Sequence, residues 1–216
     1  MCDPIDDPDL YVRVAQESNL KIRYVIDTHL HADHVSGGRR LAEASGAEYV
    51  LHESAETRYA FRRVKDREVL ELGNVAIEVL HTPGHTPEHI SLQVSDKTRG
   101  PEPWFLLTGH TVMVGDVGRT ELVSQPEAGA TALFKTIQRL KQLPDYVEIL
   151  PGAYAGSVCG RALSGKPVST IGFERRCSRA FQIDTLEQFI SFMLESIPVA
   201  PANAAVTRAL NQGWTK

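Results

Sequence analysis

The sequence contains few cysteines, no long apolar run and no excess of positive charge. Its three cysteines, Cys2, Cys159 and Cys177, form no C-x-x-C pair, so neither a disulfide framework nor a thiolate zinc site is predicted. No stretch approaches the roughly 18 consecutive apolar residues that a membrane-spanning helix needs. The acidic start of the chain also differs from a secretory signal. These absences favour a cytoplasmic protein without membrane contact.

The charge balance excludes a further class of partner. The chain has 23 Lys and Arg against 27 Asp and Glu, a net charge of -4. Binding through nucleic-acid phosphates needs clustered basic residues, and the sequence has no basic stripe, so no nucleic-acid partner is expected. With 216 residues, 42% of them hydrophobic, the chain can bury a sizeable core. We expect a single domain over residues 1–216, with a helical C-terminal extension at about 184–212.

Turn, cap and periodicity signals predict strands in clusters separated by helices. The predicted helices cover residues 8–19, 39–45, a stretch from about 126 to 140, and 186–194. The predicted strands cover residues 22–28, 48–52, 69–72, 75–80, 89–94, 104–107 and 147–150. This order indicates an α/β layered architecture, in which loops leaving strand ends can bring distant side chains together.

The most informative motif is H-x-H-x-D-H, formed by His29, His31, Asp33 and His34. It follows a predicted strand directly, and it places four side chains able to bind metal within six residues. Imidazole and carboxylate groups so close together can hold one or two metal ions. The glycines of Ser36-Gly37-Gly38 allow a tight turn after the motif.

Further histidines lie at two later points. His85 stands in Thr-Pro-Gly-His-Thr, where Pro and Gly fix a turn, and His110 follows the predicted strand 104–107. His85 is the natural additional ligand. His81 and His89 are expected to support the ligands or to be structural, and His52 to be an ordinary surface or core histidine.

The motifs T-H-L-H-A-D-H-V-S-G, H-T-P-G-H-T and T-G-x-T-x-x-V-G-D-V-G-R resemble those of the metallo-β-lactamase superfamily. Within it, the chain is most similar to the persulfide dioxygenase (sulfur dioxygenase) group, especially to the catalytic domain of bacterial fusions with rhodanese modules. The resemblance runs from Asp3-Pro4 to residues 201–204. It implies an αββα sandwich with one non-haem Fe(II), which oxidises glutathione persulfide with O2 to sulfite and glutathione.

The resemblance also implies a ligand set. Carried over by position, the iron ligands are His29, His85 and His110, with His31, Asp33 and His34 as nearby partners or secondary ligands. His110 is a departure, because the family usually has Asp there. Three imidazoles would keep the facial geometry with one negative charge fewer. The alternative is that His110 has lost ligand function and the site is impaired.

A second departure concerns the number of metal ions. Two-metal hydrolytic relatives usually have a histidine where this chain has Ala153, which carries no donor atom. A second zinc would keep only Asp33 and His34, short of the four ligands that zinc favours. One metal ion is therefore expected, Fe(II) with zinc as the alternative. The competing functions are a glyoxalase II-like hydrolase of a thioester or lactone, and a catalytically impaired interaction domain of sulfur metabolism.

Three further residues are candidates for the substrate pocket. Arg119 matches the family's G-R-T segment and could bind a glutathione carboxylate, or pair with Asp116 or Glu121 instead. Tyr154 could present a hydroxyl to the substrate. Cys159 could exchange sulfur with a persulfide, although a small buried core residue is the simpler interpretation.

The resemblance finally bears on partners. Relatives usually carry about two strands before the segment that matches Asp3-Pro4, so a bare sheet edge and a homo-oligomer are expected. The sequence contains no rhodanese segment, which makes a separate sulfurtransferase a possible partner.

Overall fold

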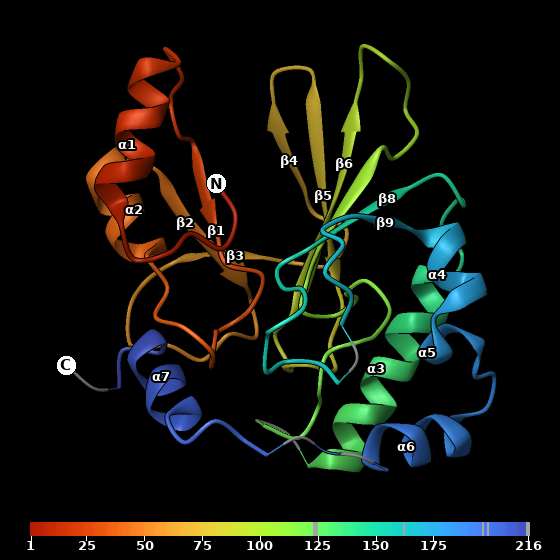
Figure 1. Ribbon diagram of the computed structural model, residues 1–216. Helices are drawn as coiled ribbons and strands as arrows, with labels where there is room; N and C mark the ends of the chain where they lie inside the picture. The colour runs from red at the N-terminus through yellow and green to blue at the C-terminus, as the bar shows by residue number, and fades with distance from the viewer. Residues whose placement is uncertain (123–124, 162, 196, 198, 215–216) are drawn as a thin grey trace. The chain divides into compact units, whose positions relative to one another are not determined.

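The computed structural model describes residues 1–122, 125–161, 163–195, 197 and 199–214. The chain divides into two compact units (Figure 1). The first unit comprises Met1–Val64 and Pro201–Lys216, and the second comprises Lys65–Ala200. Among the described residues, no helix combines the length and the apolar character needed to cross a bilayer.

The first unit contains a sheet of three parallel strands in the order β1-β2-β3. These strands are β1 (Tyr24–Ile26), β2 (Glu48–His52) and β3 (Arg62–Val64). Residues at the N-terminus pair with β1, since Cys2 forms a parallel bridge with Ile26 and the Asp3 amide donates to the Ile26 carbonyl at 2.9 Å. At this point the edge of β1 is covered by the chain itself.

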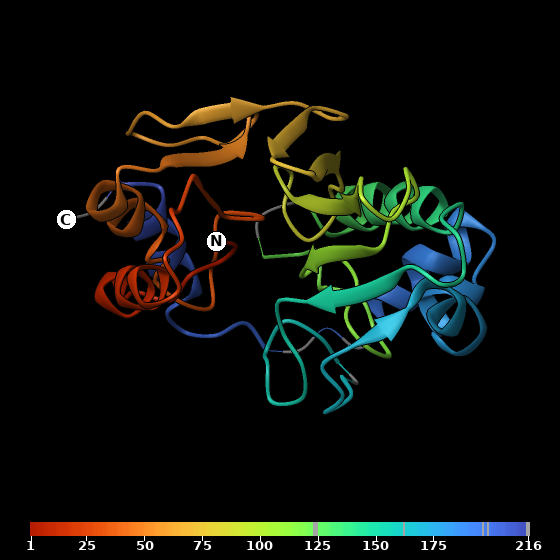
Figure 2. The same cartoon turned by 90° about the horizontal axis from the view of Figure 1, so that it is seen from above.

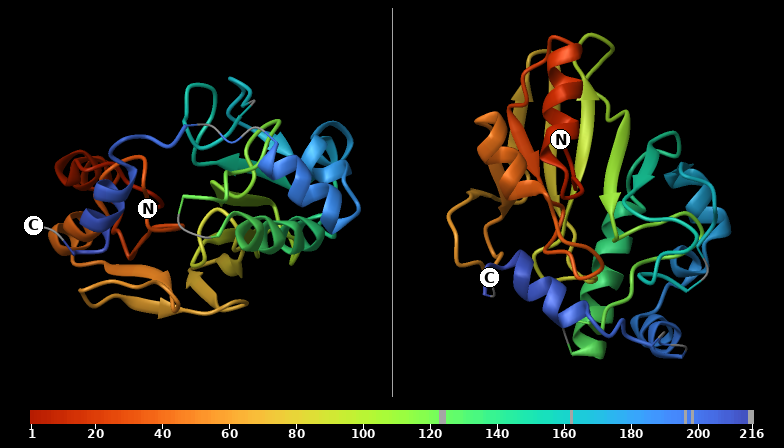
Figure 3. Two further views of the ribbon diagram at one scale, coloured as in Figure 1. Left: turned by 90° about the horizontal axis from the view of Figure 1, so that it is seen from below. Right: turned by 60° about the vertical axis from the view of Figure 1, so that its left-hand side comes forward.

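The helices of the first unit begin and end at recognisable signals. In α1 (Pro8–Glu17), the Asp7 side chain accepts from the Leu10 amide at 3.3 Å and Pro8 occupies the first turn. Helix α2 (Gly38–Ser45) ends at Gly46 in the left-handed conformation, with φ of 67°. The two helices contact each other (Figure 3, right), and Leu41 of α2 belongs to the same core as Val25 and Leu51. The C-terminal helix α7 (Ala204–Asn211) completes this unit.

The second unit contains a six-stranded sheet whose strands follow one another in sequence order. Pairing is antiparallel from β4 to β7, parallel between β7 and β8, and antiparallel between β8 and β9. Gly73, with φ of 61°, and Asn74 form the two-residue loop of the β4–β5 hairpin. The strands are β4 (Val69–Leu72), β5 (Val75–His81), β6 (Ile90–Asp96), β7 (Phe105–Gly109), β8 (Glu148–Pro151) and β9 (Ser169–Thr170).

Helices cover one face of this sheet (Figure 2). They are α3 (Pro126–Leu140), α4 (Ile171–Cys177), α5 (Arg179–Gln182) and α6 (Leu186–Leu194). Leu106 and Ile149 of the sheet share a buried core with Leu133 of α3, Phe181 of α5 and Phe189 of α6. Burying each such side chain stabilises the fold by about 1.5–3 kcal/mol before entropy is counted.

Most predicted elements are confirmed to within a few residues, but β3, β9, α4 and α5 were not predicted. Each of these is short, seven residues at most, so its periodicity is too brief to identify. The predicted C-terminal extension consists of α6 and α7, which belong to different units. Residues 196 and 198 of that extension lie outside the described residues.

Candidate metal centre

The loop that carries the H-x-H-x-D-H motif connects β1 to α2. Ser36 closes the loop, since its hydroxyl donates to Asp27 Oδ2 at 2.6 Å and accepts from the Gly38 amide at 2.9 Å. A Cβ on Gly37 would lie 2.1 Å from the Ile5 carbonyl oxygen, and one on Gly38 would lie 2.5 Å from the Tyr49 ring. The glycines are therefore needed because backbone and ring approach closely, which fixes the path of the loop.

A chain of hydrogen bonds orients His29, which is 1% exposed. The Asp3 carboxylate accepts from the Thr28 amide at 2.6 Å and from the Thr28 hydroxyl at 2.9 Å. Because that hydroxyl gives its proton to Asp3, it accepts from His29 Nδ1 at 2.9 Å. His29 is thereby set as the tautomer with a lone pair on Nε2, the form in which a histidine binds metal.

His31 lies in a different electrostatic environment. Its Nε2 contacts Asp3 Oδ1 at 3.1 Å and its Nδ1 lies 3.7 Å from Asp33 Oδ1. Burial alone would lower the pKa of His31, but the Asp3 charge and hydrogen bond, with Asp33 and Asp27, raise it to about 10. Burial likewise favours a higher pKa for Asp3, yet His31 and Thr28 hold it at about 2. His31 is therefore an imidazolium in the metal-free chain, and it must lose a proton before it can bind metal.

The rest of the motif lies close to these two rings. His34 Nδ1 contacts Asp33 Oδ1 at 3.2 Å, and the His34 side chain is one-third exposed. The ring of His31 lies 4.2 Å from that of His29 and 4.3 Å from that of His34, between centroids. One ligand atom each from His29, His31 and Asp33 lies within 4.8 Å of the others. Within the first unit, the motif thus has the compactness of a metal site.

In the second unit, a tight turn and a backbone carbonyl orient His85, which is 3% exposed. Gly84 has φ of 147°, and a Cβ there would lie 2.5 Å from the Leu133 Cβ of α3. His85 Nδ1 donates to the Arg119 carbonyl at 2.7 Å, which leaves the lone pair on Nε2. The prediction that Pro and Gly aim this imidazole agrees with the geometry.

His110 follows Gly109, the last residue of β7, and its ring faces His85. His110 Nδ1 lies 3.4 Å from His85 Nε2, and the ring centroids are 5.1 Å apart. Two nitrogens that bind one metal ion at ~2.0–2.1 Å each lie about 2.8–3.4 Å apart for bond angles between right and tetrahedral ones. The pair therefore fits two ligands of a single ion.

The role of His89 was predicted only in outline. This fully buried ring accepts from the His110 amide through Nε2 at 3.1 Å. Its Nδ1 lies 3.0 Å from the Thr82 hydroxyl and 2.9 Å from the Thr111 hydroxyl, and donates to one of them. His89 thus positions the segment that carries His110, whereas His81 contacts the Pro87 carbonyl.

Two arginines organise the loops after β7. Arg161, which was not singled out from the sequence, holds the Asp116 carboxylate through Nη2–Oδ1 at 2.9 Å and Nε–Oδ2 at 3.4 Å. Its backbone amide donates to the same carboxylate at 2.9 Å. Arg119 pairs with Glu121 and donates to the carbonyls of Val158 and Val199. These contacts give Arg119 a structural function, and its role in substrate binding stays a prediction.

The other pocket candidates differ in exposure. Tyr154 is 56% exposed, while Cys159 is 2% exposed and its carbonyl accepts from the Arg119 amide at 3.0 Å. Ala153, at the position where hydrolytic relatives have a histidine, is buried. A substrate role for Tyr154 or Cys159 stays a prediction, and burial of the Cys159 thiol agrees with the simpler core interpretation.

Comparisons with known proteins place this arrangement in a family. Residues 6–152 match the model of the metallo-beta-lactamase superfamily. The chain belongs to that superfamily. A metallo-beta-lactamase from Staphylococcus aureus is 36% identical, with a TM-score of 0.91 over 98% of this chain and 64% of its own. ETHE1 from Myxococcus xanthus is 27% identical, with a TM-score of 0.78 over 97% of this chain and 87% of its own.

One curated relative is named as a hydrolase. The hydroxyacylglutathione hydrolase of Prochlorococcus marinus (strain MIT 9211) is 28% identical over 204 residues, which are 82% of this chain and 78% of the relative. Other curated hydrolases of the superfamily are matched over about half to two-thirds of their length. The α/β fold of the metallo-beta-lactamase superfamily is thereby confirmed. The predicted ligands all lie within the matched residues 6–152, and helices α4 to α7 lie outside them.

Proposed function

We propose that this chain is an Fe(II)-dependent persulfide dioxygenase that oxidises glutathione persulfide with O2 to sulfite and glutathione. The proposed ligands are His29 of the first unit and His85 and His110 of the second. His29 and His85 donate Nδ1–H to a fixed oxygen and keep a lone pair on Nε2, and His110 presents Nδ1 to His85. The donor types of the three residues, and the tautomers of His29 and His85, therefore fit a divalent metal ion.

The observation that carries the one-metal part of the proposal, against a two-metal hydrolase, is the loss of carboxylate at the third ligand position. Asp116 is the nearest acidic residue in the chain after His110, and it could have replaced the family's aspartate. Both of its oxygens are held by Arg161, which supports His110 as the third donor. Ala153 stands where two-metal hydrolytic relatives usually have a histidine, and it has no donor atom. A ligand set without a bridging carboxylate supports one metal ion rather than two.

The protein's own groups would prepare this site for an anionic sulfur substrate. Bound Fe(II) would supply open positions for O2 and the persulfide sulfur, and the electrons for O2 activation. Three neutral imidazoles leave the charge of a divalent ion uncompensated, which favours an anionic sulfur. The Arg119 carbonyl holds the proton on His85 Nδ1, and the Thr28 hydroxyl holds that on His29 Nδ1, so neither ring can rotate without losing a hydrogen bond.

A hydrolase is the second candidate function, and it has its own support. Curated relatives are hydroxyacylglutathione hydrolases, and His29, His31 and Asp33 bring ligand atoms within 4.8 Å in the first unit. A second ion there would require His31 to exchange its proton for metal. Both candidates share a glutathione conjugate as substrate. They differ in the number of metal ions and in the need for O2.

Elemental analysis and turnover assays separate the two functions. The full chain would be purified without chelators or immobilised nickel, and then assayed with glutathione persulfide in an oxygen electrode and with a hydroxyacylglutathione thioester. The proposal predicts about one iron per chain and oxygen consumption. Two zinc ions per chain with thioester hydrolysis would establish the hydrolase instead. Bound metal without either turnover would favour the non-catalytic interaction domain.

A further inference from the structure

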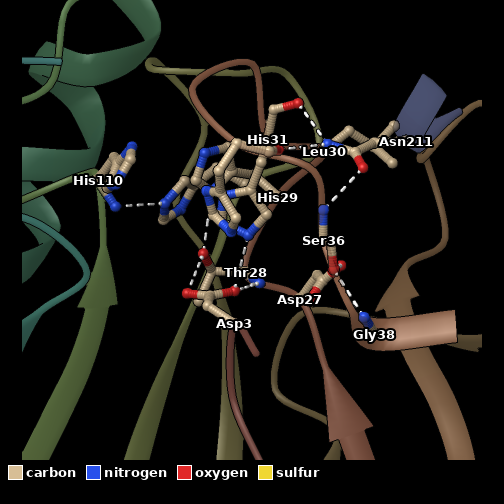
Figure 4. Close-up of polar contacts among 12 residues, drawn as sticks. Asp3, Asp27, Thr28, His29, Leu30, His31, Ser36, Gly38, His110 and Asn211 are labelled. Atoms are coloured by element: carbon tan, nitrogen blue, oxygen red, sulfur yellow. Dashed lines mark hydrogen bonds and ion pairs between the residues drawn. The ribbon is translucent and has the colours of Figure 1, made fainter. Parts of the chain in front are cut away.

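The C-terminal helix α7 reaches the loop that carries the H-x-H-x-D-H motif through the side chains of Arg208 and Asn211. The Asn211 carboxamide accepts from the Ser36 amide through Oδ1 at 2.9 Å. Its Nδ2 donates to the carbonyls of His31 at 2.8 Å and His34 at 2.9 Å. Figure 4 shows Asn211 against the loop, with its bond to Ser36. A residue 175 positions from Ser36 thus holds both sides of the loop segment that contains Asp33.

The three bonds match the chemistry of a primary amide. Asn211 is 8% exposed, so these contacts exchange little with water. An asparagine side chain has two N–H donors and one carbonyl oxygen, and here both donors and the oxygen are used. Aspartate has the same shape, but it would place carboxylate oxygen against the two carbonyls of His31 and His34. An aliphatic residue would remove these three bonds from backbone groups that are buried or partly buried, each at a cost of desolvation.

Asn211 is held in place independently of the loop. Its backbone carbonyl accepts from the Tyr59 hydroxyl, and the next carbonyl, that of Gln212, accepts from the Arg58 amide at 2.9 Å. One turn earlier on α7, Arg208 donates to the Leu30 carbonyl at 2.5 Å. The helix is therefore attached to residues 58–59 on one side, and it contacts the loop on the other.

We propose that Asn211 is a positioning residue, which holds the loop of residues 30–36 in the shape that presents the His29–His34 motif to metal. The inference rests on the proposed metal site. Helix α7 lies outside residues 6–152, which match the family model, so this support comes from a segment beyond the matched part of the chain. Bonds that fix the backbone of a metal loop reduce the entropy lost when the metal binds.

The test compares Asn211→Ala and Asn211→Asp with Gln212→Ala in the full chain. Gln212 is the neighbouring amide on α7, and its side chain donates to the Glu56 carbonyl at 3.2 Å. Hydrogen exchange of residues 30–37 is measured without metal, and Fe(II) affinity is measured by competition with a chelator. We expect both Asn211 variants to speed exchange at least about tenfold and to weaken metal binding by about 10–100-fold. Gln212→Ala is expected to change either quantity less than twofold.

Several outcomes would overturn the inference. Unchanged exchange and affinity in the Asn211 variants would do so, as would equal changes in Gln212→Ala, since these would indicate general loosening of α7. If Asn211→Ala fails to fold, the isosteric Asn211→Asp decides the question by the same two measurements. A parent chain that binds no metal would contradict the proposed function, whereas faster exchange in the Asn211 variants would still support their hold on the loop.

Discussion

The two units carry their histidines in different ways. In the first unit, His29, His31 and His34 are close because they are close in sequence, and remote side chains shape their loop. Asp3 holds Thr28 and His31, and Asn211 holds the loop backbone. A local motif therefore specifies which candidate ligands are present, while distant residues specify their orientation and protonation.

In the second unit, the two histidines are distant in sequence, and groups near them orient their rings. His85 and His110 are 25 residues apart, and they meet because β5, β6 and β7 are neighbours in one sheet. Their orientation comes from nearby backbone groups and from one buried ring, since His85 bonds to the Arg119 carbonyl and the His110 amide bonds to His89. The strand order therefore brings these two side chains together. The first unit also differs because His31 carries a proton. The comparison can be tested by removing a ligand from each unit.

The largest expected effect is loss of metal when a proposed ligand is removed from either unit. His29→Ala and His85→Ala should each weaken Fe(II) binding more than about 100-fold, because two protein ligands hold the ion far less firmly than three. Elemental analysis after gel filtration measures the bound iron. His81→Ala is the matched control, since His81 contacts the Pro87 carbonyl at 2.9 Å and is expected to keep full metal content. Full metal content in His29→Ala would show that the ligand set implied by the family resemblance is wrong.

A smaller effect is expected at His110, which separates a ligand role from an impaired site. His110→Ala should lower iron affinity by about 10–100-fold, while His110→Asp should keep one iron per chain and increase oxygen consumption with glutathione persulfide. Chelator competition and an oxygen electrode give the two quantities. Full metal and activity in His110→Ala would remove this residue from the ligand set. Failure of both the parent and the Asp variant to consume oxygen, with metal bound, would favour the non-catalytic interpretation.

The contrast between the units also explains how far the sequence could be interpreted. The H-x-H-x-D-H motif and the turn before His85 could be identified in the sequence because each consists of a few consecutive residues. The proton on His31 was not predictable, because it depends on Asp3, whose carboxylate lies 28 residues away in sequence. Arg161 was missed for the same reason, since its partner Asp116 is 45 residues distant and nothing in the local pattern indicates the pair.

The fold shows the same limit. The strands over 69–72 and 75–80 were predicted from alternation and from the Gly73-Asn74 turn, and a further strand was predicted over 48–52. Short elements such as β9, with two residues, form only because β8 offers a free edge for pairing. Edge pairing is a tertiary effect, and single-sequence periodicity does not contain it. Candidate ligands are thus easier to predict than the groups that orient them.

A pH measurement on the metal-free chain tests the difference in protonation. The folded pKa of His31, about 10, lies above the ordinary histidine value of 6.5, so its stabilisation is complete below pH 6.5 and is lost as pH rises through 10. The folded pKa of Asp3, about 2, lies below 3.8, so its stabilisation is complete above pH 3.8 and is lost as pH falls through 2. The pair should stabilise the fold most between pH 3.8 and 6.5.

Asp3→Asn should remove that stabilisation. Its free energy of unfolding, measured by urea denaturation, should fall by ~2 kcal/mol near pH 5.5 relative to the parent. The difference should shrink as the pH approaches 10, because His31 then loses its proton in the parent. His52→Asn, at a buried histidine bonded to the Ser54 hydroxyl at 2.7 Å, serves as the control outside the motif. A difference that does not depend on pH would contradict the imidazolium assignment.

The smallest expected effect on the metal is at Asp116, and it sharpens the choice of third ligand. Asp116→Asn weakens the pair with Arg161, which stabilises the loops after β7, so the melting temperature should fall by a few degrees. Iron content should stay at the parent level, because the Asp116 carboxylate is held by Arg161 and is not among the proposed ligands. Arg161→Lys is the matched variant on the other side of the pair, and it should give the same loss of thermal stability with the same metal content. Iron lost from Asp116→Asn but kept in His110→Ala would exchange the two residues in the ligand set and restore a carboxylate to the third position.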